Sequence, residues 1–552
     1  MNYIVVGGVA AGASFACRLR RLDENSKITI FEKSNFVSYA NCGLPYYISS
    51  VIKEKSSLTL QTPNSLKKRF NIDVFVNHEV VKINKEKKSV IVKDLLTNLE
   101  KEFFYDKLIL ALGAEAIKLT PNSSKIFELK TVEDSLRIKE YVINNNIHTA
   151  TVIGGGFIGL EISENLIKLG IKVNLIEGRN HVLANLDLDV ATFVHEELRN
   201  NNINLFLNKI VRSIEEKEDC VVTKLDGFEI ESDILIQAIG VRPNSKLAAD
   251  SNLKLDFKNS IAVNDVYQTS DENIFAIGDV ICLNSFFDNS KVNIALAGLA
   301  NKEGRDLASY FAFNKVNEIK PLGTSILKLF NLSIGSVGLS EEQLKQKNII
   351  FDKIYLSPYN HATYYPNSKM FFIKVLFNKN NYEILGAQIV GEEGVDKRID
   401  VLATCIKAHL KGYELGSLEL SYAPPFASAK DPINMIGYMI ENLKNNLVKQ
   451  FYVEGLDKII SSENSLLIDV RTKEEYDADH INGSVNIPLD ELRDNLFKIN
   501  KDKTIYLICF SALRSYIAAR ILTQKGYDCF HLAGGYRLFK SLNNDLSHIN
   551  VL

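Results

Sequence analysis

A strand, a glycine-rich turn, a helix and a second strand follow one another twice in this chain, and no other feature restricts its fold as strongly. In the first copy these strand, helix and strand segments lie at 2–6, 10–22 and 28–32. In the second copy they lie at 151–153, 157–169 and 172–176. Because this order opens a doubly wound parallel sheet, the pattern predicts an α/β chain with two nucleotide-binding units.

The second turn carries a complete dinucleotide fingerprint. Gly154, Gly156 and Gly159 occupy the three glycine positions of G-x-G-x-x-G. Glycines there allow a tight turn and bring the backbone close to a pyrophosphate, which sits at the N-terminus of the following helix. Glu177 follows Gly159 by 18 residues, where an acid can bond a ribose 2′-hydroxyl. These residues predict a dinucleotide site.

The first turn departs from this pattern at one position. Gly7 and Gly12 match the first and third glycines, but Val9 stands where the second belongs. Glu32 supplies the acid, 20 residues after Gly12. A second dinucleotide site is the prediction, and a merely glycine-rich turn is the alternative.

The rest of the chain suggests four domains, since 552 residues are too many for one core. Apolar strands at 107–112 and 233–240 return the chain between the two nucleotide-binding units, and an α+β pattern follows residue 322. The expected parts are a first nucleotide-binding domain at 1–112 and 246–322, a second at 113–245, an α+β domain at 323–445, a linker at 446–455 and a C-terminal α/β domain at 456–552.

Composition excludes several classes of protein. The net charge of −2 gives no basic excess for binding nucleic acid, and no apolar run approaches the ~18 residues of a membrane span. The N-terminus lacks the pattern of a signal peptide. Seven scattered cysteines suggest reduced thiols, so we expect a cytoplasmic protein without a disulfide framework or a metal site.

A third segment connects the two turns to a known family. Asn273–Asp279 reads as a strand that ends in Gly278-Asp279. Together with the two turns, it resembles the pyridine nucleotide–disulfide oxidoreductase family over roughly residues 1–445. The resemblance implies FAD at the first turn, with Asp279 on its ribityl chain, and NAD(P)H at the second turn. Glu177 favours NADH because a carboxylate repels a 2′-phosphate, whereas Lys172 and Arg179 keep NADPH open.

The segment after the first nucleotide-binding unit contains the candidate redox residue. Cys42 lies in Asn-Cys-Gly-Leu-Pro, and Pro45 suits the first turn of a helix. The helix dipole is therefore expected to lower the pKa of the thiol. No second cysteine follows before Cys220. A single thiol must store its oxidised state as a mixed disulfide, a persulfide or a sulfenic acid.

The sequence motif around Cys42, Asn-Cys-Gly-Leu-Pro-Tyr, resembles that of the coenzyme A disulfide reductases within this family. The resemblance implies that Tyr364, or else Tyr365, and Tyr422 of a partner subunit stabilise the leaving thiolate in a homodimer formed through residues 325–440. It implies coenzyme A contacts at Ser38 and Asn41. The other candidates for its phosphates are basic residues, each of which a solvated basic face explains equally well: Arg18, Arg21, Lys67, Lys68 and Arg69.

The last ~95 residues, a length that suits one small domain, contain the segments Leu466–Arg471, Glu474–Tyr476, His480–Ser484, Asn486–Pro488 and Leu532–Tyr536. In their order and spacing, these segments resemble a rhodanese domain. Cys509 begins the segment that corresponds to the active loop, and Arg514 ends it. Backbone N–H groups of such a loop stabilise a thiolate or persulfide. Ala512 stands where the loop usually has glycine, so a strained or inactive domain that only docks proteins is the alternative.

These features predict an NAD(P)H-dependent flavoenzyme that reduces coenzyme A disulfide, persulfide or polysulfide through Cys42. Cys509 would handle sulfane sulfur. The enzymatic alternative is a single-cysteine NADH oxidase or peroxidase, in which Cys42 cycles through a sulfenate. A flavin-binding redox sensor is the rival outside enzymology.

Overall fold

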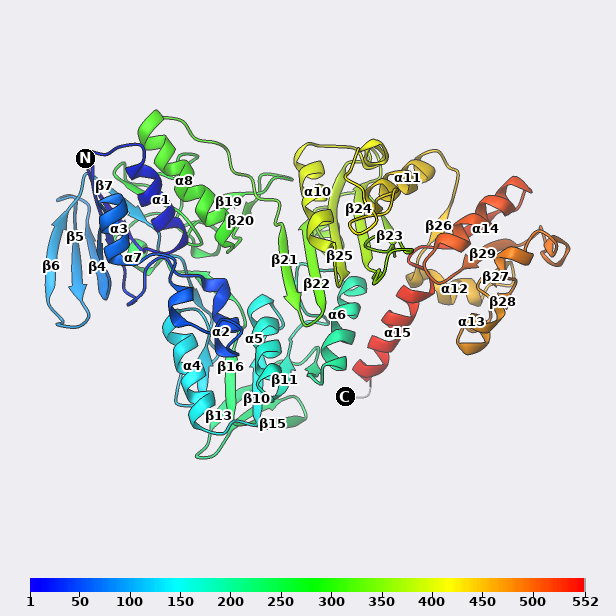
Figure 1. Ribbon diagram of the computed structural model, residues 1–552, viewed down its shortest axis with the longest axis horizontal. Helices are drawn as coiled ribbons and strands as arrows, with labels where there is room; N and C mark the ends of the chain where they lie inside the picture. The colour runs from blue at the N-terminus through cyan, green and yellow to red at the C-terminus, as the bar shows by residue number, and fades with distance from the viewer. Residues whose placement is uncertain (551–552) are drawn as a thin grey trace. The chain divides into compact units, whose positions relative to one another are not determined.

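The computed structural model describes the backbone of residues 1–550 and the side chains of residues 1–547. Its contacts divide the chain into two compact units, which are drawn in Figure 1. The first unit comprises Met1–Arg179 and Asn202–Leu322, and the second comprises Asn180–Asn201 and Gly323–Leu552. The segment 180–201, expected with the pyridine-nucleotide domain, therefore makes most of its contacts with the C-terminal part of the chain.

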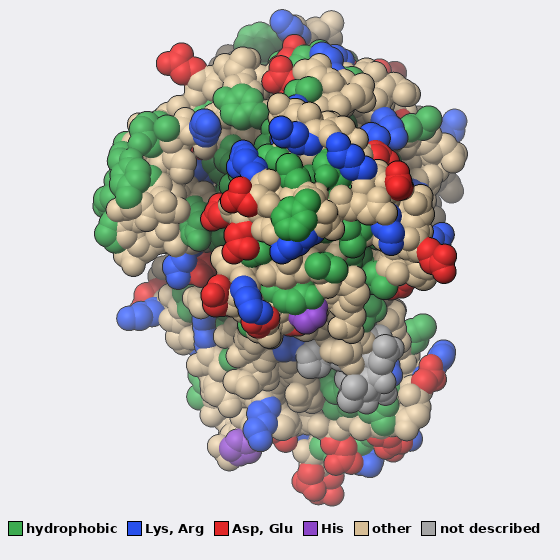
Figure 2. All heavy atoms as spheres, turned by 90° about the vertical axis from the view of Figure 1, so that its right-hand side faces the viewer, with side chains coloured by type: hydrophobic (Ala, Val, Ile, Leu, Met, Phe, Trp, Pro, Cys, Tyr) green, Lys and Arg blue, Asp and Glu red, His purple; other side chains and the backbone are tan. Residues whose placement is uncertain are grey.

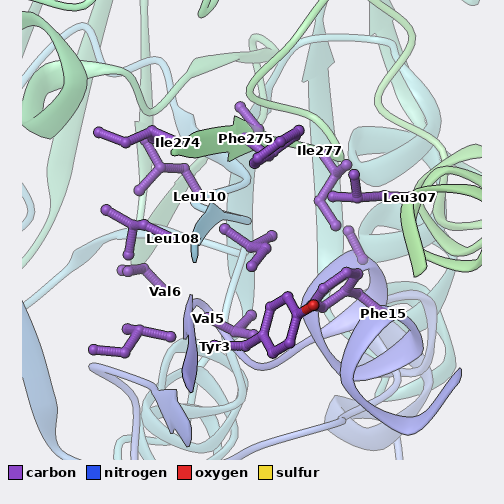
Figure 3. Packing of buried hydrophobic residues seen from close by; sticks show 14 of the residues in the cluster. Tyr3, Val5, Val6, Phe15, Leu108, Leu110, Ile274, Phe275, Ile277 and Leu307 are labelled. Carbon is purple, nitrogen blue, oxygen red and sulfur yellow. The ribbon is translucent and has the colours of Figure 1, made fainter. Parts of the chain in front are cut away.

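The first sheet of the first unit is five-stranded and parallel. In sheet order its strands are β18 (Ile274–Ala276), β7 (Lys107–Leu110), β1 (Asn2–Val6), β2 (Lys27–Phe31) and β3 (Asp73–Phe75). Helices α1 (Ala10–Arg20) and α8 (Ala297–Phe313) pack against each other beside this sheet. Figure 3 shows the shared core, in which the ring of Phe15 on α1 packs edge-on against Tyr3 of β1, with ring centroids 6.3 Å apart. Burying such side chains stabilises the fold by about 1.5–3 kcal/mol each.

A second five-stranded parallel sheet forms around the second glycine turn. Its strands, in order, are β12 (Asn204–Phe206), β11 (Lys172–Ile176), β10 (Thr149–Ile153), β16 (Ile234–Gln237) and β9 (Ile126–Glu128). Helix α5 (Phe157–Lys168) connects β10 to β11, and α4 (Val132–Asn144) packs beside β9. Both doubly wound units predicted from the sequence are confirmed.

The first unit also contains two three-stranded antiparallel sheets, which the sequence analysis did not predict. One comprises β4 (His78–Asn84), β5 (Ser89–Asp94) and β6 (Glu100–Phe104). The other comprises β13 (Ser213–Glu216), β14 (Val221–Leu225) and β15 (Phe228–Ser232). The strands of these two sheets are short and only weakly amphipathic. Hydrophobic periodicity therefore predicts them poorly.

The second unit contains an antiparallel sheet followed by a smaller parallel sheet. The antiparallel sheet has the order β21 (Ser325–Leu329), β22 (Leu332–Gly338), β25 (Ile384–Gly391), β24 (Phe372–Asn378) and β23 (Phe351–Leu356). Helix α10 (Val395–Lys407) packs on β22 and β25, and α11 (Pro432–Lys444) contacts β23. This is the α+β domain expected after residue 322.

The C-terminal parallel sheet has the order β26 (Gln450–Phe451), β30 (Cys529–Leu532), β29 (Thr504–Ile508), β27 (Ser465–Asp469) and β28 (Val485–Asn486). Strand β26 lies inside the segment 446–455 that was expected to be a linker. It pairs in parallel with β30 and is thus part of this sheet. The expectation failed because two paired residues are too few to give a periodic pattern.

The last helix, α15 (Gly535–Asn550), packs against α6 (Leu188–Asn200) within the second unit. Asp545 of α15 accepts hydrogen bonds from His195 Nδ1 at 3.0 Å and from Arg199 at 2.7 Å. His195 and Asp545 are buried, and this contact explains why 180–201 clusters with the C-terminal region.

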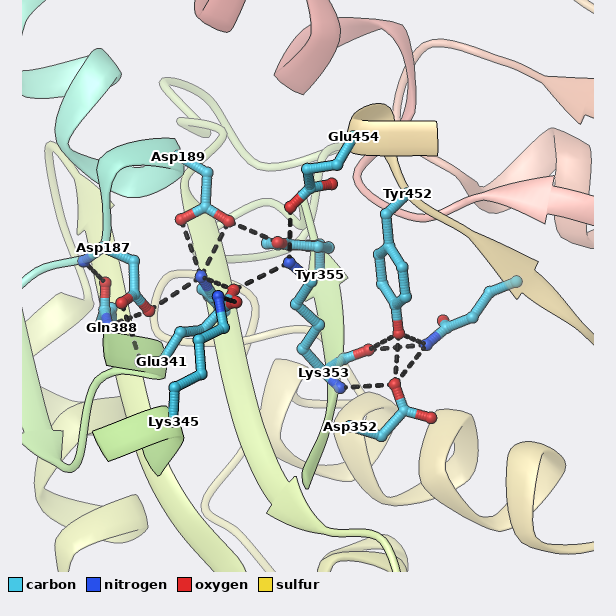
Figure 4. A network of polar contacts seen from close by, with 12 residues as sticks. Asp187, Asp189, Glu341, Lys345, Asp352, Lys353, Tyr355, Gln388, Tyr452 and Glu454 are labelled. Atoms are coloured by element: carbon cyan, nitrogen blue, oxygen red, sulfur yellow. Dashed lines mark hydrogen bonds and ion pairs between the residues drawn. The ribbon is translucent and has the colours of Figure 1, made fainter. Parts of the chain in front are cut away.

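A buried charge network connects α6 with the antiparallel sheet (Figure 4). Lys374 is fully buried, and its ammonium group lies 2.6–2.8 Å from carboxylate oxygens of Asp187, Asp189 and Glu341. Burial alone would lower the pKa of Lys374, but the three carboxylates raise it above the ordinary value. The same positive charge, with Lys353, lowers the pKa of Glu341 to about 2 against its burial. Each buried charge is thus paired.

On the face of the molecule drawn in Figure 2, acidic and basic side chains are interspersed. Among the described helices, none combines the length and apolar character that crossing a membrane requires.

Candidate active site

The first glycine turn has the tight geometry of a dinucleotide turn despite Val9. Gly7 has φ +98°, and a Cβ on Gly12 would lie 1.9 Å from the carbonyl oxygen of Gly7. Only glycine fits both conditions. Val9 precedes α1 with φ −98°, which any L-residue adopts. The departure at Val9 therefore leaves the turn intact.

The second turn repeats this geometry around the N-terminus of α5. Gly154 has φ +109°, and a Cβ on Gly159 would lie 1.8 Å from the Gly154 oxygen. Gly156 precedes the helix, and no atom lies within 4 Å of where its Cβ would be. This free space beside a helix N-terminus suits the approach of a pyrophosphate.

An acid at the end of the second strand holds each turn. Glu32 accepts a hydrogen bond from the Gly8 N–H at 2.7 Å, and Glu177 accepts one from the Gly155 N–H at 2.7 Å. In both acids the other oxygen accepts a backbone N–H two residues further on. Burial raises the pKa of Glu32, and the Gly8 N–H opposes this rise. The acids thus order the turn itself, in addition to the ribose contact expected from the sequence.

Gly278 and Asp279 follow β18 in the first unit. The Gly278 N–H donates to the buried Glu303 of α8 at 2.5 Å, and burial raises the pKa of Glu303 to about 8. Asp279 lies 3.8 Å from the ammonium group of Lys130. Burial raises the pKa of Asp279, and Lys130 counteracts the rise. Sequence reasoning missed Glu303 and Lys130, because neither belongs to a motif.

These residues fit FAD. The first turn leaves backbone N–H groups at the N-terminus of α1, and Asp279 offers a partly desolvated carboxylate in the same unit. Two buried polar atoms nearby in the sequence, Arg18 Nε and Asn41 Oδ1, have no hydrogen-bond partner in the protein. Buried polar atoms are normally paired, so both suit contact with a bound polar group.

Cys42 lies in a short 3₁₀ turn, Asn41–Gly43, directly before α2 (Leu44–Ile48). Pro45 stands in the first turn of α2, as the sequence predicted. Cys42 is exposed, and it is the only exposed cysteine among the seven, all of which lie in the described residues. Cys42 is thus the most accessible thiol in the unit that contains both dinucleotide turns, where Cys17 and Cys220 are half-buried and Cys282 is buried.

The expectation of a lowered Cys42 pKa is wrong for the protein alone. Partial desolvation by neighbouring atoms raises the pKa of the thiol, Glu161 raises it further, and Lys130 lowers it. Glu161 accepts a hydrogen bond from the Tyr46 hydroxyl at 3.2 Å, and burial raises its own pKa to about 7. Helix α2 has only five residues, so its dipole is too weak to outweigh burial and a carboxylate.

Replacing Lys130 by methionine should move the pKa of Cys42 further up. The ammonium charge stabilises the thiolate, so its removal favours the neutral thiol. The rate of alkylation of reduced protein by iodoacetamide, measured against pH, should reach half its maximum at a higher pH. Lys118→Met is the matched control, because Lys118 pairs with Glu128 and should leave the profile unchanged. An unshifted profile for Lys130→Met contradicts the assignment.

The candidate coenzyme A contacts differ in their surroundings. Ser38 adopts φ +49°, and its backbone N–H bonds the Gly8 oxygen, so this segment is tied to the first turn. Arg21 lies over the ring of Phe70 at 5.9 Å. Lys67 is paired with Asp73 at 2.8 Å, which makes it a weaker candidate than the sequence suggested.

Tyr364 and Tyr422 lie together in the second unit. Their hydroxyl oxygens are 2.7 Å apart, although 58 residues separate them in sequence. Both side chains are exposed, by 74% and 48%. The hydrogen bond with Tyr422 raises the pKa of Tyr364. Tyr365, the alternative, instead packs edge-on against His361, with ring centroids 5.6 Å apart.

The candidate rhodanese loop follows β29 and leads into α14 (Leu513–Gln524). Cys509 is buried, with its Sγ 3.4 Å from the Ser515 hydroxyl. The guanidinium group of Arg514 donates to both carboxylate oxygens of Glu475 at 2.6 and 2.7 Å. This hydrogen-bonded pair lowers the pKa of Glu475 to about 2. Glu475 is a further residue that sequence reasoning missed.

Ala512 occupies the strained position that the sequence suggested. It has φ +72° and precedes α14. Ala512→Gly should stabilise the closed loop by ~0.5–1 kcal/mol, because glycine adopts this conformation without a Cβ clash. Native-state hydrogen exchange of 509–524 should become slower. Ala519→Gly in the interior of α14 is the matched control and should do the opposite. Faster exchange in Ala512→Gly contradicts the prediction.

Comparisons with known proteins agree with this geometry. The family profile of pyridine nucleotide-disulphide oxidoreductases matches residues 1–304, the profile of their dimerisation domain matches 324–432, and the rhodanese-like domain profile matches 453–542. Coenzyme A disulfide reductase of Staphylococcus haemolyticus (strain JCSC1435) is 39% identical over 441 residues, which cover 80% of this chain and 99% of that protein.

Two solved structures match nearly the whole chain. The crystal structure of reduced Bacillus anthracis CoADR-RHD has a TM-score of 0.95 and 44% identity, and the match covers 99% of this chain and 98% of that one. A NAD-dependent persulfide reductase from A. fulgidus has a TM-score of 0.91 and 32% identity, with 98% and 100% covered. This chain therefore belongs to the pyridine nucleotide-disulphide oxidoreductase family and has a C-terminal rhodanese-like domain.

Proposed function

We propose that this protein is a FAD-dependent NAD(P)H oxidoreductase that reduces coenzyme A disulfide or coenzyme A persulfide through Cys42. The observation that carries the proposal is that Cys42 is the one fully exposed cysteine in the unit that contains both dinucleotide turns. Coenzyme A disulfide reductase and persulfide reductase are the names of its relatives, which supports the substrate class.

The bound FAD, when reduced by NAD(P)H, supplies the electron pair for the reaction. The Cys42 thiolate attacks one sulfur of coenzyme A disulfide, so that a Cys42–S–S–CoA bond forms and one coenzyme A thiolate leaves. Uptake of two electrons and a proton by this mixed disulfide would regenerate the Cys42 thiolate and release the second coenzyme A as a thiol. In total NADH, a proton and the disulfide give NAD⁺ and two coenzyme A thiols. With a persulfide the products are one coenzyme A thiol and hydrogen sulfide.

The family resemblance supports a role for Tyr364 and Tyr422 of a partner subunit in stabilising the leaving thiolate. Their paired hydroxyls support this role, because one can donate a proton while the other stabilises the resulting phenolate. The match of 324–432 to a dimerisation domain supports a homodimer. Glu177 at the second turn supports NADH as the preferred coenzyme. Seven free cysteines support a reducing compartment, the cytoplasm.

The C-terminal domain is proposed to carry sulfane sulfur on Cys509. The backbone around this residue closes tightly, since a Cβ on Gly535 would lie 2.7 Å from the Cys509 oxygen. Arg514 and Glu475 hold the other end of the loop. Sulfur bound here would make coenzyme A persulfide or polysulfide the physiological substrate.

Mass spectrometry of peptides from the treated holoenzyme tests the proposal. After exposure to coenzyme A disulfide, the peptide with Cys42 should carry one coenzyme A, and NADH should release it. A persulfide donor should add one sulfur to the peptide with Cys509. NADH-dependent oxygen or peroxide consumption without coenzyme A, together with a Cys42 peptide that never carries coenzyme A, would overturn it in favour of an oxidase.

A further inference from the structure

Arg398 is a buried arginine that joins two loops of the second unit. It lies on α10, is 1% exposed, and belongs to none of the sequence motifs. One of its terminal nitrogens donates to the carbonyl oxygen of Asn360 at 2.9 Å and to the carboxylate of Asp431 at 2.9 Å. The other donates to the Gly394 oxygen at 3.2 Å. Asn360 and Asp431 each end a segment that carries one of the paired tyrosines.

Asn360 closes the loop that contains Tyr364. Its N–H donates to the Lys369 oxygen at 2.9 Å, and its side-chain oxygen accepts the Lys369 N–H at 2.8 Å. The loop between these two residues is thus held at its base. Because Arg398 bonds Asn360 from the side of α10, the base of the loop is fixed to that helix.

Asp431 ends the segment that contains Tyr422. One carboxylate oxygen caps α11 through the Ile433 N–H at 3.0 Å, and the other accepts the bond from Arg398. Lys397, the neighbour of Arg398 on α10, donates to the Ser421 oxygen at 3.4 Å. Both ends of the segment 421–431 are therefore held from the start of α10.

Gly394 leaves room for the arginine. It has φ +75°, and a Cβ there would lie 2.4 Å from a guanidinium nitrogen of Arg398. A side chain at this position would be strained and would displace the guanidinium group. The backbone at the start of α10 is thus shaped around Arg398.

Stability is a poor reason for such a group. A buried ion pair recovers little more than the cost of removing its charges from water, and apolar side chains of similar volume often stabilise a fold as well or better. Directional bonds from one planar guanidinium group to two loops do give orientation. Tyr364 and Tyr422 need such orientation, because both side chains are exposed and little packing fixes them, and yet their hydroxyl oxygens lie 2.7 Å apart.

We infer that Arg398 is a positioning residue, which sets the Tyr364–Tyr422 pair through Asn360 and Asp431. This inference rests on the proposed function, since it assigns the pair to the release of the coenzyme A thiolate. Arg398 contacts no reacting atom. It acts on the step that uses the tyrosines and on no other.

The test compares two half-reactions in the holoenzyme. The first variant, Arg398→Lys, keeps the positive charge but loses the planar guanidinium group that donates to both loops. The second variant combines Arg398→Met with Asp431→Asn, which removes both buried charges and keeps an N-cap residue for α11. Reduction of the flavin by NADH in stopped flow should stay within twofold of the parent. Turnover with coenzyme A disulfide should fall about 10–100-fold.

A double-mutant cycle separates positioning from general damage. In a Tyr422→Phe background the Arg398 variants should cause little further loss, because the pair they position is already broken. Gln388→Met, which removes a buried polar contact of β25, a strand on which α10 packs, should leave turnover unchanged.

The inference would be overturned if the Arg398 variants reduced turnover equally in the parent and in the Tyr422→Phe background. Full turnover in both Arg398 variants would overturn it as well. A parent enzyme that reduces neither coenzyme A disulfide nor coenzyme A persulfide would instead refute the proposed function.

Discussion

Replacing Cys42 by serine is expected to abolish NADH-dependent reduction of coenzyme A disulfide, with a loss on the order of 10⁴–10⁶-fold. A serine hydroxyl is far less acidic than a thiol and forms no mixed disulfide. No neighbouring thiol can substitute, because the other cysteines of the first unit, Cys17, Cys220 and Cys282, are less accessible than Cys42. Steady-state NADH consumption with coenzyme A disulfide measures the effect.

Two controls accompany this substitution. Cys220→Ser changes another thiol of the same unit, outside both glycine turns, and should keep full turnover. Reduction of the flavin by NADH should persist in Cys42→Ser, because the residues of the two turns are unchanged. Retained turnover with coenzyme A disulfide in Cys42→Ser would refute the proposed mechanism.

Replacing Cys509 by serine should abolish sulfane-sulfur transfer from thiosulfate to cyanide, on the order of 10³-fold or more. Cys509 directly follows β29 at the start of the loop, with its Sγ 3.4 Å from the Ser515 hydroxyl, and it is the proposed carrier of the persulfide. Reduction of coenzyme A disulfide should remain, because the proposed mechanism assigns it to Cys42. Separate assays of the two reactions on one preparation measure the division of labour.

Cys529→Ser is the matched control for this prediction. Cys529 is buried in the adjacent strand and contacts the Thr523 hydroxyl at 3.2 Å. Its replacement should leave both reactions intact. Wild-type sulfur transfer by Cys509→Ser would assign the rhodanese-like domain to docking, the alternative that Ala512 left open.

The local elements of the fold could be predicted because each has a short-range signal. The two glycine turns recur with an acid at similar spacing, and the structure places Gly7 and Gly154 in the same left-handed conformation. Ala512 shows the same logic, since its place in the loop indicated a positive φ, which the structure has. Such positions depend on backbone conformation within a few residues.

The surroundings of Cys42 were beyond sequence reasoning. Lys130 and Glu161 lie 88 and 119 residues after Cys42, yet both act on its pKa. The sequence-based expectation that a helix dipole lowers the pKa of Cys42 took only neighbouring residues into account. The direction of the expected shift was therefore wrong. A pKa depends on desolvation and on all nearby charges, which only the folded chain brings together.

The sequence by itself determined the two nucleotide-binding units, the single cysteine that we propose as the redox residue and the C-terminal rhodanese-like domain, because motifs of a few residues carry them. The tertiary structure alone decided how the supporting groups meet. It pairs the hydroxyls of Tyr364 and Tyr422, places Arg398 between their loops and docks α15 on α6. These contacts join segments far apart in the chain, where packing and directional hydrogen bonds set the geometry and no local pattern records it.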